Sequence, residues 1–408
     1  MIEQKGYWIL GALLVLLIIV FATIEMLRST TNPTTTPTSL VTTFKDNART
    51  SRAFTWYTKS PHAGTVIQWV EGNNVESLEE QDVTTTKGTT TTIDIGNRTL
   101  EGVHKVNITG LKPGRTYAYR VGNGDAEGWS DPALFTTEAE DVTDFTFINV
   151  TDSQGITEQD FDLWGNTLDQ AFKTFPTAQF IIHGGDLIEY PEDESAWENF
   201  FGKAKKWITN YPLMPVTGNH DEVDKVADRF VSHFNVPNNG SEDTIPGTSY
   251  SFDYGTAHFV FMNTESSVKD QAQWLRDDLV ATDKSWIIVA IHRPAYGGNQ
   301  DDKVVKRWVP IFDEFGVDLV LQGHNHEYSR SFPLKGNKIV EDGEGTVYVV
   351  PLTSGQKFNE KKEDQFYHKV HFQYNKQMYA GVHINGNTLT YQAYDVDGKK
   401  LDEFVLTH

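Results

Sequence analysis

The 408-residue sequence predicts a β-sandwich followed by a larger α/β domain, both behind an apolar N-terminal helix. Three observations lead to this prediction. Short runs of β-branched and aromatic residues, separated by turn residues, fill much of the first third of the chain. Further on, apolar strands end in polar clusters, several of them about 33 residues apart, which is the size of a strand-helix-strand step. Before both regions, residues 7–24 are almost entirely apolar.

Residues 1–28 predict a membrane anchor or a signal segment. An apolar stretch of about 18 to 20 residues is long enough, as a helix, to span the hydrocarbon core of a bilayer. No cleavage site with small residues follows Ile24, so an uncleaved anchor is favoured over a secretory signal. Residues 29–39 are rich in Thr and Pro and predict a semi-stiff linker. We expect a single-pass protein of the cell membrane with its folded part outside or, alternatively, a secreted protein.

The composition excludes several classes of function. The formal net charge of -21 argues against a broad nucleic-acid-binding surface, because phosphate backbones are held largely by Lys and Arg. The absence of cysteine excludes disulfides, thiolate metal sites and a cysteine nucleophile. Any anionic substrate therefore requires a local positive site built from other residue types. The sequence does not indicate a particular protein partner.

Residues 40–140 predict an all-β unit of about seven strands. The run from Leu111 to Tyr117, LKPGRTY, resembles the tyrosine corner of fibronectin type III domains. This resemblance implies a sandwich that acts as a spacer or shapes a neighbouring substrate site, with an independent ligand-binding role as the alternative. Nothing in the unit indicates catalysis.

Polar clusters follow five predicted strands of residues 141–408. In an α/β sheet of mostly parallel strands, side chains at the carboxyl ends of the strands converge on one crevice. Carboxylate and carbonyl oxygens suit Mn or Fe and imidazole suits Zn or Fe, so these residue types predict a centre of two divalent metal ions. The clusters are Thr151-Asp152-Ser153-Gln154, His183-Gly184-Gly185-Asp186, Gly218-Asn219-His220-Asp221, His292 and Gly323-His324-Asn325-His326.

The order of these clusters resembles the calcineurin-like metallophosphoesterase superfamily. With the fibronectin-like unit in front, the layout is similar to the purple acid phosphatase branch. The resemblance covers about residues 40–408 and implies an αββα arrangement of two sheets for residues 141–408. The implied metal ligands are Asp186 as the bridge, Asp152 and His326 for the first ion, and Asn219, His292 and His324 for the second.

Two positions bear on how far the purple enzymes are a guide. Glu189 stands three residues after Asp186, where the purple enzymes carry a tyrosine, so a ferric-tyrosinate centre is not expected. Gln154 stands two residues after Asp152, where many other members of the superfamily carry histidine. We expect the Gln154 side-chain oxygen to bind the first metal, with a hydrogen-bonding role behind the ligands as the alternative. Glu189 itself is expected to be a solvated or capping carboxylate, with contact to a metal ion as the alternative.

His220 and Asp221 are the predicted catalytic residues. The resemblance implies that His220 faces the leaving group, and Asp221 is then expected to orient it. In this hypothesis a metal-bound hydroxide attacks phosphorus while His220 donates a proton to the leaving oxygen. Residues that follow His292 and residues that follow the last two histidines are expected to rim the crevice, where substrate contact is the functional alternative to a surface role. These residues are Arg293, Tyr296, Tyr328 and Arg330.

The expected function is hydrolysis of phosphate esters by an acid phosphatase-like phosphomonoesterase. A phosphodiesterase or nucleotide hydrolase is the alternative, because the missing tyrosine weakens the transfer of a monoester preference. A catalytically inactive surface adhesion or scaffold protein is a more distant alternative, and the full set of ligands argues against it. The expected partners are a phosphate ester and, through the N-terminal helix, a membrane.

Overall fold

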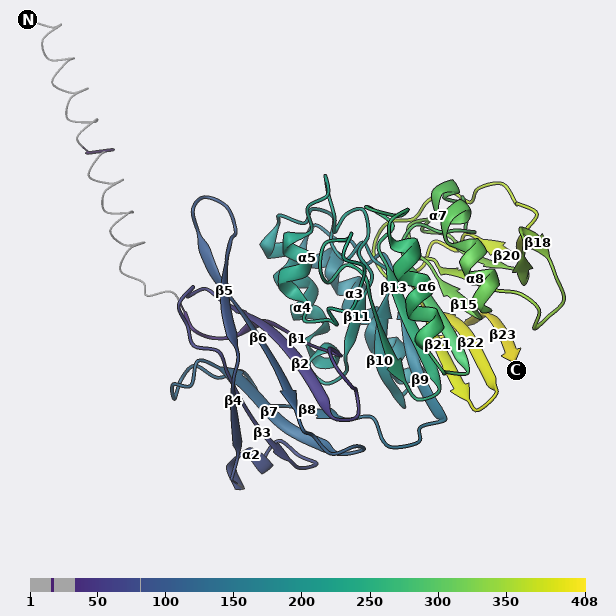
Figure 1. The fold of residues 1–408 in the computed structure, drawn as a ribbon. Helices are drawn as coiled ribbons and strands as arrows, with labels where there is room; N and C mark the ends of the chain where they lie inside the picture. Colours follow the sequence, from purple (N-terminus) through teal and green to yellow (C-terminus); the bar gives the residue numbers. More distant parts are fainter. Residues whose placement is uncertain (1–15, 18–33, 81) are drawn as a thin grey trace, which may run out of the picture.

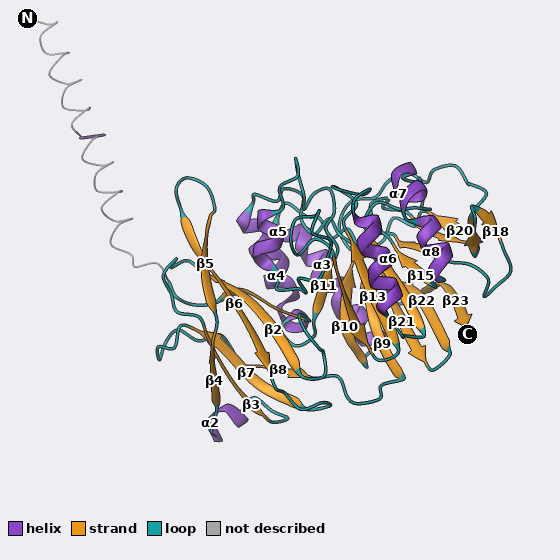
Figure 2. Cartoon of the chain, in the orientation of Figure 1, coloured by secondary structure: helices purple, strands orange, loops and turns teal. Residues whose placement is uncertain are grey.

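The computed structural model describes residues 16–17, 34–80 and 82–408 (Figure 1). From residue 34 onward the chain forms a β-sandwich and a domain of two sheets covered by helices (Figure 2). The predicted anchor, from Tyr7 to Ile24, lies outside the described residues except at two positions. Within the described part of the chain, no helix combines the length and the apolar character needed to cross a bilayer. The anchor therefore stays a prediction.

The sandwich consists of two four-stranded antiparallel sheets around an aromatic core that includes Phe54, Trp56 and Phe135. The Tyr117 hydroxyl accepts a hydrogen bond from the Lys112 backbone N–H at 2.8 Å, which is the contact of a tyrosine corner. One sheet contains β1 (Thr38–Thr43), β2 (Ser51–Thr58), β6 (Leu100–Thr109) and β5 (Thr89–Asp94), and the other contains β4 (Thr84–Lys87), β3 (Val66–Glu71), β7 (Thr116–Gly122) and β8 (Ala133–Thr136). The short helix α2 (Ser77–Glu80) follows β3, and β1 begins inside the predicted linker.

The first sheet of the second domain combines parallel strands with an antiparallel meander. The strand order is β11-β10-β9-β21-β22-β23. The final meander, β21-β22-β23, joins this sheet because β21 pairs with the free edge of β9, from Ala380 opposite Asn149 to Asn385 opposite Asp144. The strands are β9 (Asp144–Val150), β10 (Ala178–His183), β11 (Leu213–Pro215), β21 (Met378–Asn385), β22 (Thr388–Asp395) and β23 (Lys400–Thr407).

The second sheet has the order β12-β13-β14-β15-β19-β16-β20. Its central strands β13, β14, β15 and β19 are parallel, and β12 and β13 form a hairpin. The strands are β12 (Tyr250–Tyr254), β13 (Ala257–Met262), β14 (Trp286–Ile291), β15 (Leu319–Leu321), β16 (Tyr328–Ser331), β19 (Val347–Pro351) and β20 (His368–Phe372), with the small hairpin β17 (Leu334–Lys335) and β18 (Lys338–Ile339) between β16 and β19.

Helices cover the outer faces of the two sheets, which pack against each other. Phe147 of the first sheet lies 5.4 Å from Phe259 of the second between ring centroids. On the first sheet, Trp164 of α3 stacks on Phe200 of α4 at 5.1 Å. This layering has the αββα order that the resemblance implies. The helices are α3 (Glu158–Thr174), α4 (Glu194–Ile208) and α5 (Asp228–His233), then α6 (Gln271–Ala281), α7 (Asp302–Arg307) and α8 (Val309–Phe315) on the second sheet.

The sandwich packs firmly against the second domain. Phe44, which follows β1, belongs to the core of the second domain and lies 5.5 Å from Phe180 between ring centroids. The Tyr119 hydroxyl donates to the Thr209 carbonyl oxygen at 2.6 Å, at the C-terminal end of α4. The sandwich thus supports the sheet whose strands β9, β10 and β11 lead to the predicted ligands.

Candidate metal centre

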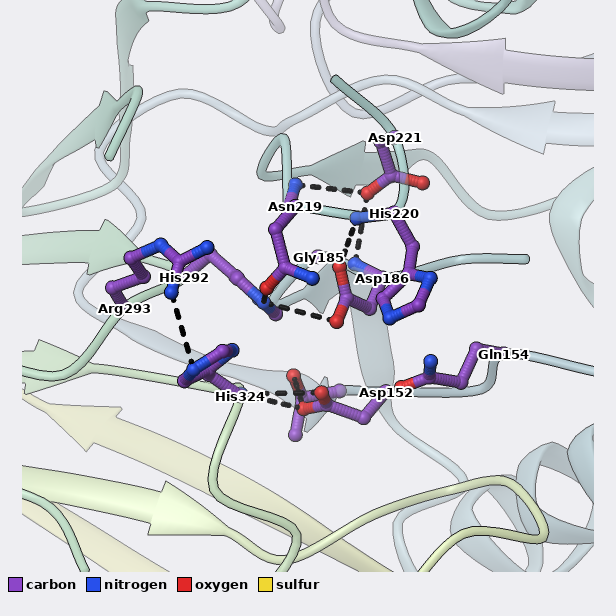
Figure 3. Close-up of polar contacts among 12 residues, drawn as sticks. Asp152, Gln154, Gly185, Asp186, Asn219, His220, Asp221, His292, Arg293 and His324 are labelled. Carbon is purple, nitrogen blue, oxygen red and sulfur yellow. Dashed lines mark hydrogen bonds and ion pairs between the residues drawn. The ribbon is translucent and has the colours of Figure 1, made fainter. Parts of the chain in front are cut away.

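The predicted ligands lie where strands of both sheets end (Figure 3). β9, β10 and β11 run parallel, as do β14 and β15, so their carboxyl ends meet on one side of the domain. Two groups of ligand atoms form there, each with all its atoms within 4.8 Å of one another, and Asp186 belongs to both. One group consists of Asp152, Asp186 and His326, and the other of Asp186, His292 and His324.

The backbone of this centre is held in an uncommon conformation. Asp152, Asp186, His324 and His326 all have positive φ values, of 51°, 52°, 72° and 51°. Residues other than glycine rarely adopt this left-handed backbone conformation, and backbone strain of this kind is concentrated at functional sites. Gly218 lets the chain approach closely, because a Cβ atom there would collide with the Asp186 carboxylate. The strand ends are therefore shaped around the carboxylates.

Two histidines present the same ring nitrogen to the centre. His292 Nδ1 lies 2.8 Å from the Gly184 carbonyl oxygen, and His326 Nδ1 lies 2.9 Å from that of Lys357. A carbonyl oxygen only accepts, so Nδ1 carries the proton in both rings and Nε2 is directed to the centre. Metal-binding histidines usually have this arrangement, in which the second nitrogen is fixed by a backbone carbonyl or a carboxylate.

The distances between ligand atoms fit metal coordination. His292 Nε2 lies 3.1 Å from Asp186 Oδ2, and His326 Nε2 lies 3.1 Å from Asp152 Oδ1. Two atoms that each lie about 2.1 Å from one ion, at a right angle, are about 3 Å apart. Asn219 Oδ1, at 3.3 Å from His292 Nε2, extends the second group.

Electrostatics favour a cation at this place. Burial lowers the pKa of His292, but the Asp186 carboxylate and then Asp152 raise it more, to a net value of about 10. The carboxylates therefore hold a positive charge at His292 Nε2, and a bound metal ion would replace this proton. By contrast, burial and then the neighbouring His292 and Arg293 lower the pKa of His324 to about 3, so His324 is neutral and can act as a ligand.

Gln154 contains a buried acceptor without a hydrogen-bond partner. Its side chain is fully buried, and its Nε2 donates to Glu189 Oε2 at 2.8 Å. Its Oε1 has no partner among the described residues. Buried polar atoms nearly always have a partner, so this oxygen indicates a missing ligand. The oxygen and imidazole set of the centre therefore fits two divalent ions such as Mn, Fe or Zn.

The predicted pairing of His220 with Asp221 is corrected. Asp221 accepts hydrogen bonds from the backbone N–H groups of Asp186, Leu187 and Gly218, at 2.8, 3.1 and 2.9 Å. It therefore anchors the Asp186 loop. His220 Nδ1 instead lies 2.8 Å from the Glu189 carbonyl oxygen and 3.8 Å from Glu189 Oε1. These contacts give Glu189 a role at the site that the expectation of a solvated or capping carboxylate did not include, although its place at the family's tyrosine position was a signal.

Of the four predicted substrate contacts, the structure places Arg293 beside the centre. Its Nη1 lies 3.3 Å from His324 Nε2, and Glu265 orients its guanidinium through contacts of 2.9 to 3.1 Å. The side chain is 32% exposed, so it can reach a ligand. Glu265 was not predicted from the sequence.

The expectation of substrate contact is corrected for the other three residues, because their polar atoms form hydrogen bonds with side chains outside the centre. Tyr296 is buried and its hydroxyl donates to Asn337 Oδ1 at 2.9 Å. The Tyr328 hydroxyl donates to Asp402 Oδ2 at 2.7 Å, and Arg330 pairs with both oxygens of Asp402 at 2.6 and 2.9 Å. These residues stabilise the second sheet and its contact with β23.

A further group of potential ligands, Asp364, His368 and His371, lies outside this centre. Both ring nitrogens of His368 are engaged. Nδ1 accepts from the Gln365 backbone N–H at 3.0 Å, and Nε2 lies 2.8 Å from the Gly297 carbonyl oxygen. His368 therefore has no free lone pair for a metal ion.

Both domains match families of known proteins. Residues 37–137 match the purple acid phosphatase N-terminal domain, and residues 145–328 match the calcineurin-like phosphoesterase family. Acid phosphatase type 7 of Danio rerio is 28% identical over 74% of this chain and 77% of its own length. An uncharacterized protein of Mycobacterium tuberculosis is 26% identical over 42% of this chain, and the match spans only 41% of that relative.

A solved structure supports the same fold. The purple acid phosphatase PPD1 from yellow lupin (Lupinus luteus) seeds superposes with a TM-score of 0.79 at 18% sequence identity, covering 91% of this chain and 74% of the lupin chain. At this level of identity the likeness concerns the fold alone. The two matched family models show that the chain carries a calcineurin-like phosphoesterase domain behind a purple acid phosphatase N-terminal domain.

Proposed function

We propose that this chain is a metal-dependent phosphoric ester hydrolase that acts on phosphomonoesters. The observation that carries the proposal is the pair of ligand groups that share Asp186. The proposed ligands are Asp152, Gln154, Asp186 and His326 around one ion, and Asp186, Asn219, His292 and His324 around the other. Bound ions would supply Lewis acidity and an activated water for attack on phosphorus.

We propose that His220 acts as the proton donor. Its Nδ1–H is committed to the Glu189 carbonyl oxygen, which leaves Nε2 for a substrate atom. The ring is 23% exposed, and the His220 backbone N–H donates to Asp186 Oδ1 at 2.8 Å, so the imidazole stands directly beside the centre. A protonated Nε2 can donate to the leaving oxygen of the ester as the P–O bond breaks.

We propose that Arg293 binds the substrate phosphate. Its guanidinium always carries a charge, and Glu265 fixes its plane next to His324. The remaining exposed N–H groups can donate to a phosphoryl oxygen. In a chain of net charge -21, this arginine and the metal positions would concentrate positive potential where an anionic ester binds.

A substrate panel tests this proposal. The protein is loaded with Mn, Fe or Zn and assayed on p-nitrophenyl phosphate, its bis-ester and a set of nucleotides. We expect the highest kcat/KM on the monoester. A preference for the bis-ester or for nucleotides would replace the monoester assignment, and no hydrolysis by protein that binds two ions would support an inactive scaffold.

We propose that the centre is colourless with divalent ions. Glu189 stands at the tyrosine position of the purple enzymes, and the neighbouring Tyr190 is 51% exposed. A tyrosinate charge-transfer band in the visible spectrum of iron-loaded protein would contradict this proposal.

We propose an external location at the cell membrane, with secretion as the alternative. Support comes from the apolar stretch of residues 7–24 and the linker that follows it. Fractionation of expressing cells, followed by protease treatment of intact cells, tests it, and a protease-protected cytosolic protein would contradict it.

A further inference from the structure

Glu189 connects two functional side chains through two different parts of its own structure. Its carboxylate Oε2 accepts from Gln154 Nε2 at 2.8 Å, while its main-chain carbonyl oxygen accepts from His220 Nδ1 at 2.8 Å. Its backbone N–H also donates to the Gly155 carbonyl oxygen at 3.2 Å, which ties the loop after β10 to the loop after β9. Glu189 thus lies between the Gln154 amide and the His220 imidazole, and its backbone is held by the Gly155 carbonyl oxygen.

The carboxylate determines which way the Gln154 amide faces. A carboxylate only accepts hydrogen bonds, so the NH2 end of Gln154 has to face Glu189. The opposite end, Oε1, is then turned toward Asp152 (Figure 3). An amide turned by 180° would direct two N–H donors to the place where a cation binds and would leave two oxygens facing each other at Glu189. The contact therefore selects the one orientation that can bind a metal.

The contact is sheltered, which makes this selection effective. Gln154 is fully buried, and the Glu189 side chain is 21% exposed. Among the described residues, no group hydrogen-bonds to Gln154 Oε1, so the contact of Nε2 with Glu189 is the one that orients the amide. Hydrogen bonds to a charged acceptor are roughly twice as strong as neutral ones.

We propose that Glu189 is a positioning residue: its carboxylate turns Gln154 Oε1 toward the first metal ion, and its main-chain carbonyl holds His220. The proposal rests on the proposed function, since it assigns Gln154 to that metal centre. Substitution of the side chain separates the two roles, because the main-chain carbonyl remains in every variant. Loss of the carboxylate should weaken the first metal site and leave the His220 contact in place.

The test measures metal binding, without any assay of activity. In Glu189→Met the side chain keeps a similar length but has no acceptor oxygen. Titration calorimetry with Mn or Zn is expected to show one site unchanged and the other weakened about 10-fold to 100-fold, the usual effect of removing a group that orients a ligand. Glu189→Gln supplies an amide oxygen as acceptor and should restore most of the affinity. Glu189→Lys, which can only donate, should weaken the site as much as Glu189→Met or more.

Glu192 offers a matched control on the same loop. Its side chain is exposed, so Glu192→Met should bind both ions as the natural chain does. A change of the same size in Glu192→Met and Glu189→Met would mean that the loop as a whole is disturbed, and would overturn the proposal. Thermal denaturation shows whether each variant folds, and if Glu189→Met does not, the shorter Glu189→Ser, which cannot reach Gln154, takes its place.

A double-mutant cycle with Gln154→Met shows whether Glu189 acts through Gln154. We expect Gln154→Met to weaken the same site, and the double variant to bind no more weakly than Gln154→Met alone. Additive losses, or two full-affinity sites in Glu189→Met, would overturn the inference. These outcomes are separate from a failure of the proposed function, which would be two intact metal sites without hydrolysis in the natural chain.

Discussion

The sandwich and the metal centre both contain a buried histidine, but the ring is neutral in the sandwich and positively charged in the centre. In the sandwich, His104 lies between the hydroxyls of Thr58 and Thr65, at 2.8 and 2.7 Å, and stacks on Trp56. Burial lowers the pKa of His104 to about 4, so it is neutral and its hydrogen bonds are complete. In the centre, His292 lies against Asp186, and the carboxylates raise its pKa to about 10 against the effect of burial.

The difference shows what each region is built to do. One partner of His104, Thr58, lies on the neighbouring strand β2, and the other, Thr65, directly precedes β3 of the facing sheet, so both ring nitrogens have partners within the sandwich. The centre collects carboxylates and imidazoles from strand ends far apart in the sequence, on a backbone with positive φ at Asp152, Asp186 and His324. Such an arrangement is incomplete without cations. A buried polar group whose hydrogen bonds are all made within the protein stabilises the fold, whereas a buried polar group that lacks a partner indicates a binding site.

The largest expected effect is that of Asp186→Asn, which tests whether the centre needs the shared charge. The substitution keeps the shape of the side chain but removes one negative charge from both ligand groups. Since the loss of a group that only orients a ligand costs about 10-fold to 100-fold in affinity or activity, the loss of this ligand should exceed about 100-fold. Hydrolysis of p-nitrophenyl phosphate by metal-loaded protein measures it. Near-normal turnover would contradict the assignment. Asp125→Asn, on an exposed turn of the sandwich, is the control.

His220→Ala should have the next largest effect, and this effect should depend on the leaving group. A general acid contributes roughly 100-fold to 10,000-fold to a rate. An alkyl phosphate has a poor leaving group and needs the proton, so kcat/KM should fall by about 100-fold or more, whereas an activated aryl phosphate should lose far less. Equal losses on both esters would argue against proton donation. Two intact metal sites by calorimetry would show that the centre itself remains.

Much of the fold could be predicted from the sequence because it rests on local signals. Alternation in the sandwich, the tyrosine corner at Tyr117 and the spacing of the strand ends are all visible in the chain. The place of the final meander was not, because the pairing of β21 with β9 joins strands far apart in the sequence. Each strand pattern alone is compatible with the edge of either sheet.

The residues of the site can be divided in the same way, into those that local sequence signals identify and those that depend on contacts distant in the sequence. Ligands that occupy a motif position, such as Asp186 and His292, could be named from the sequence. Asp221 could not be assigned correctly, because its partners are backbone N–H groups, which leave no mark on the sequence. Arg330 and Tyr328 occupy sequence positions typical of rim residues, but both donate hydrogen bonds to Asp402. Asp402 lies on β23, far away in the sequence, so this contact could not be predicted.

His104→Ala tests the sandwich side of the comparison. Removing a buried ring that is stacked and hydrogen-bonded should lower the free energy of unfolding by roughly 2 to 4 kcal/mol, measured by urea denaturation. Metal affinity should not change. The folded pKa of about 4 is below the unfolded value near 6.5, so the contribution from the neutral ring is present above pH 6.5 and is lost as the pH falls through 4. A constant difference between variant and natural chain over this range would contradict the buried neutral assignment.

The smallest expected effect concerns His258, which shows that local partners, and not the domain, determine how a histidine behaves. His258 lies in the second domain with Asp253 at 2.7 Å and Asp278 at 2.8 Å, at the seam with the sandwich. Burial lowers its pKa, but the hydrogen bonds to both carboxylates raise it more, to about 9. The charged ring therefore stabilises the fold fully below pH 6.5, and this stability is lost as the pH rises through 9.

We expect His258→Gln to be destabilised by about 1 kcal/mol near pH 6, since Asp253 is half exposed and solvent screens the pair. The difference from the natural chain should vanish near pH 10. A difference that instead shrinks toward acid pH, as expected for His104, would show that His258 is buried as a neutral ring.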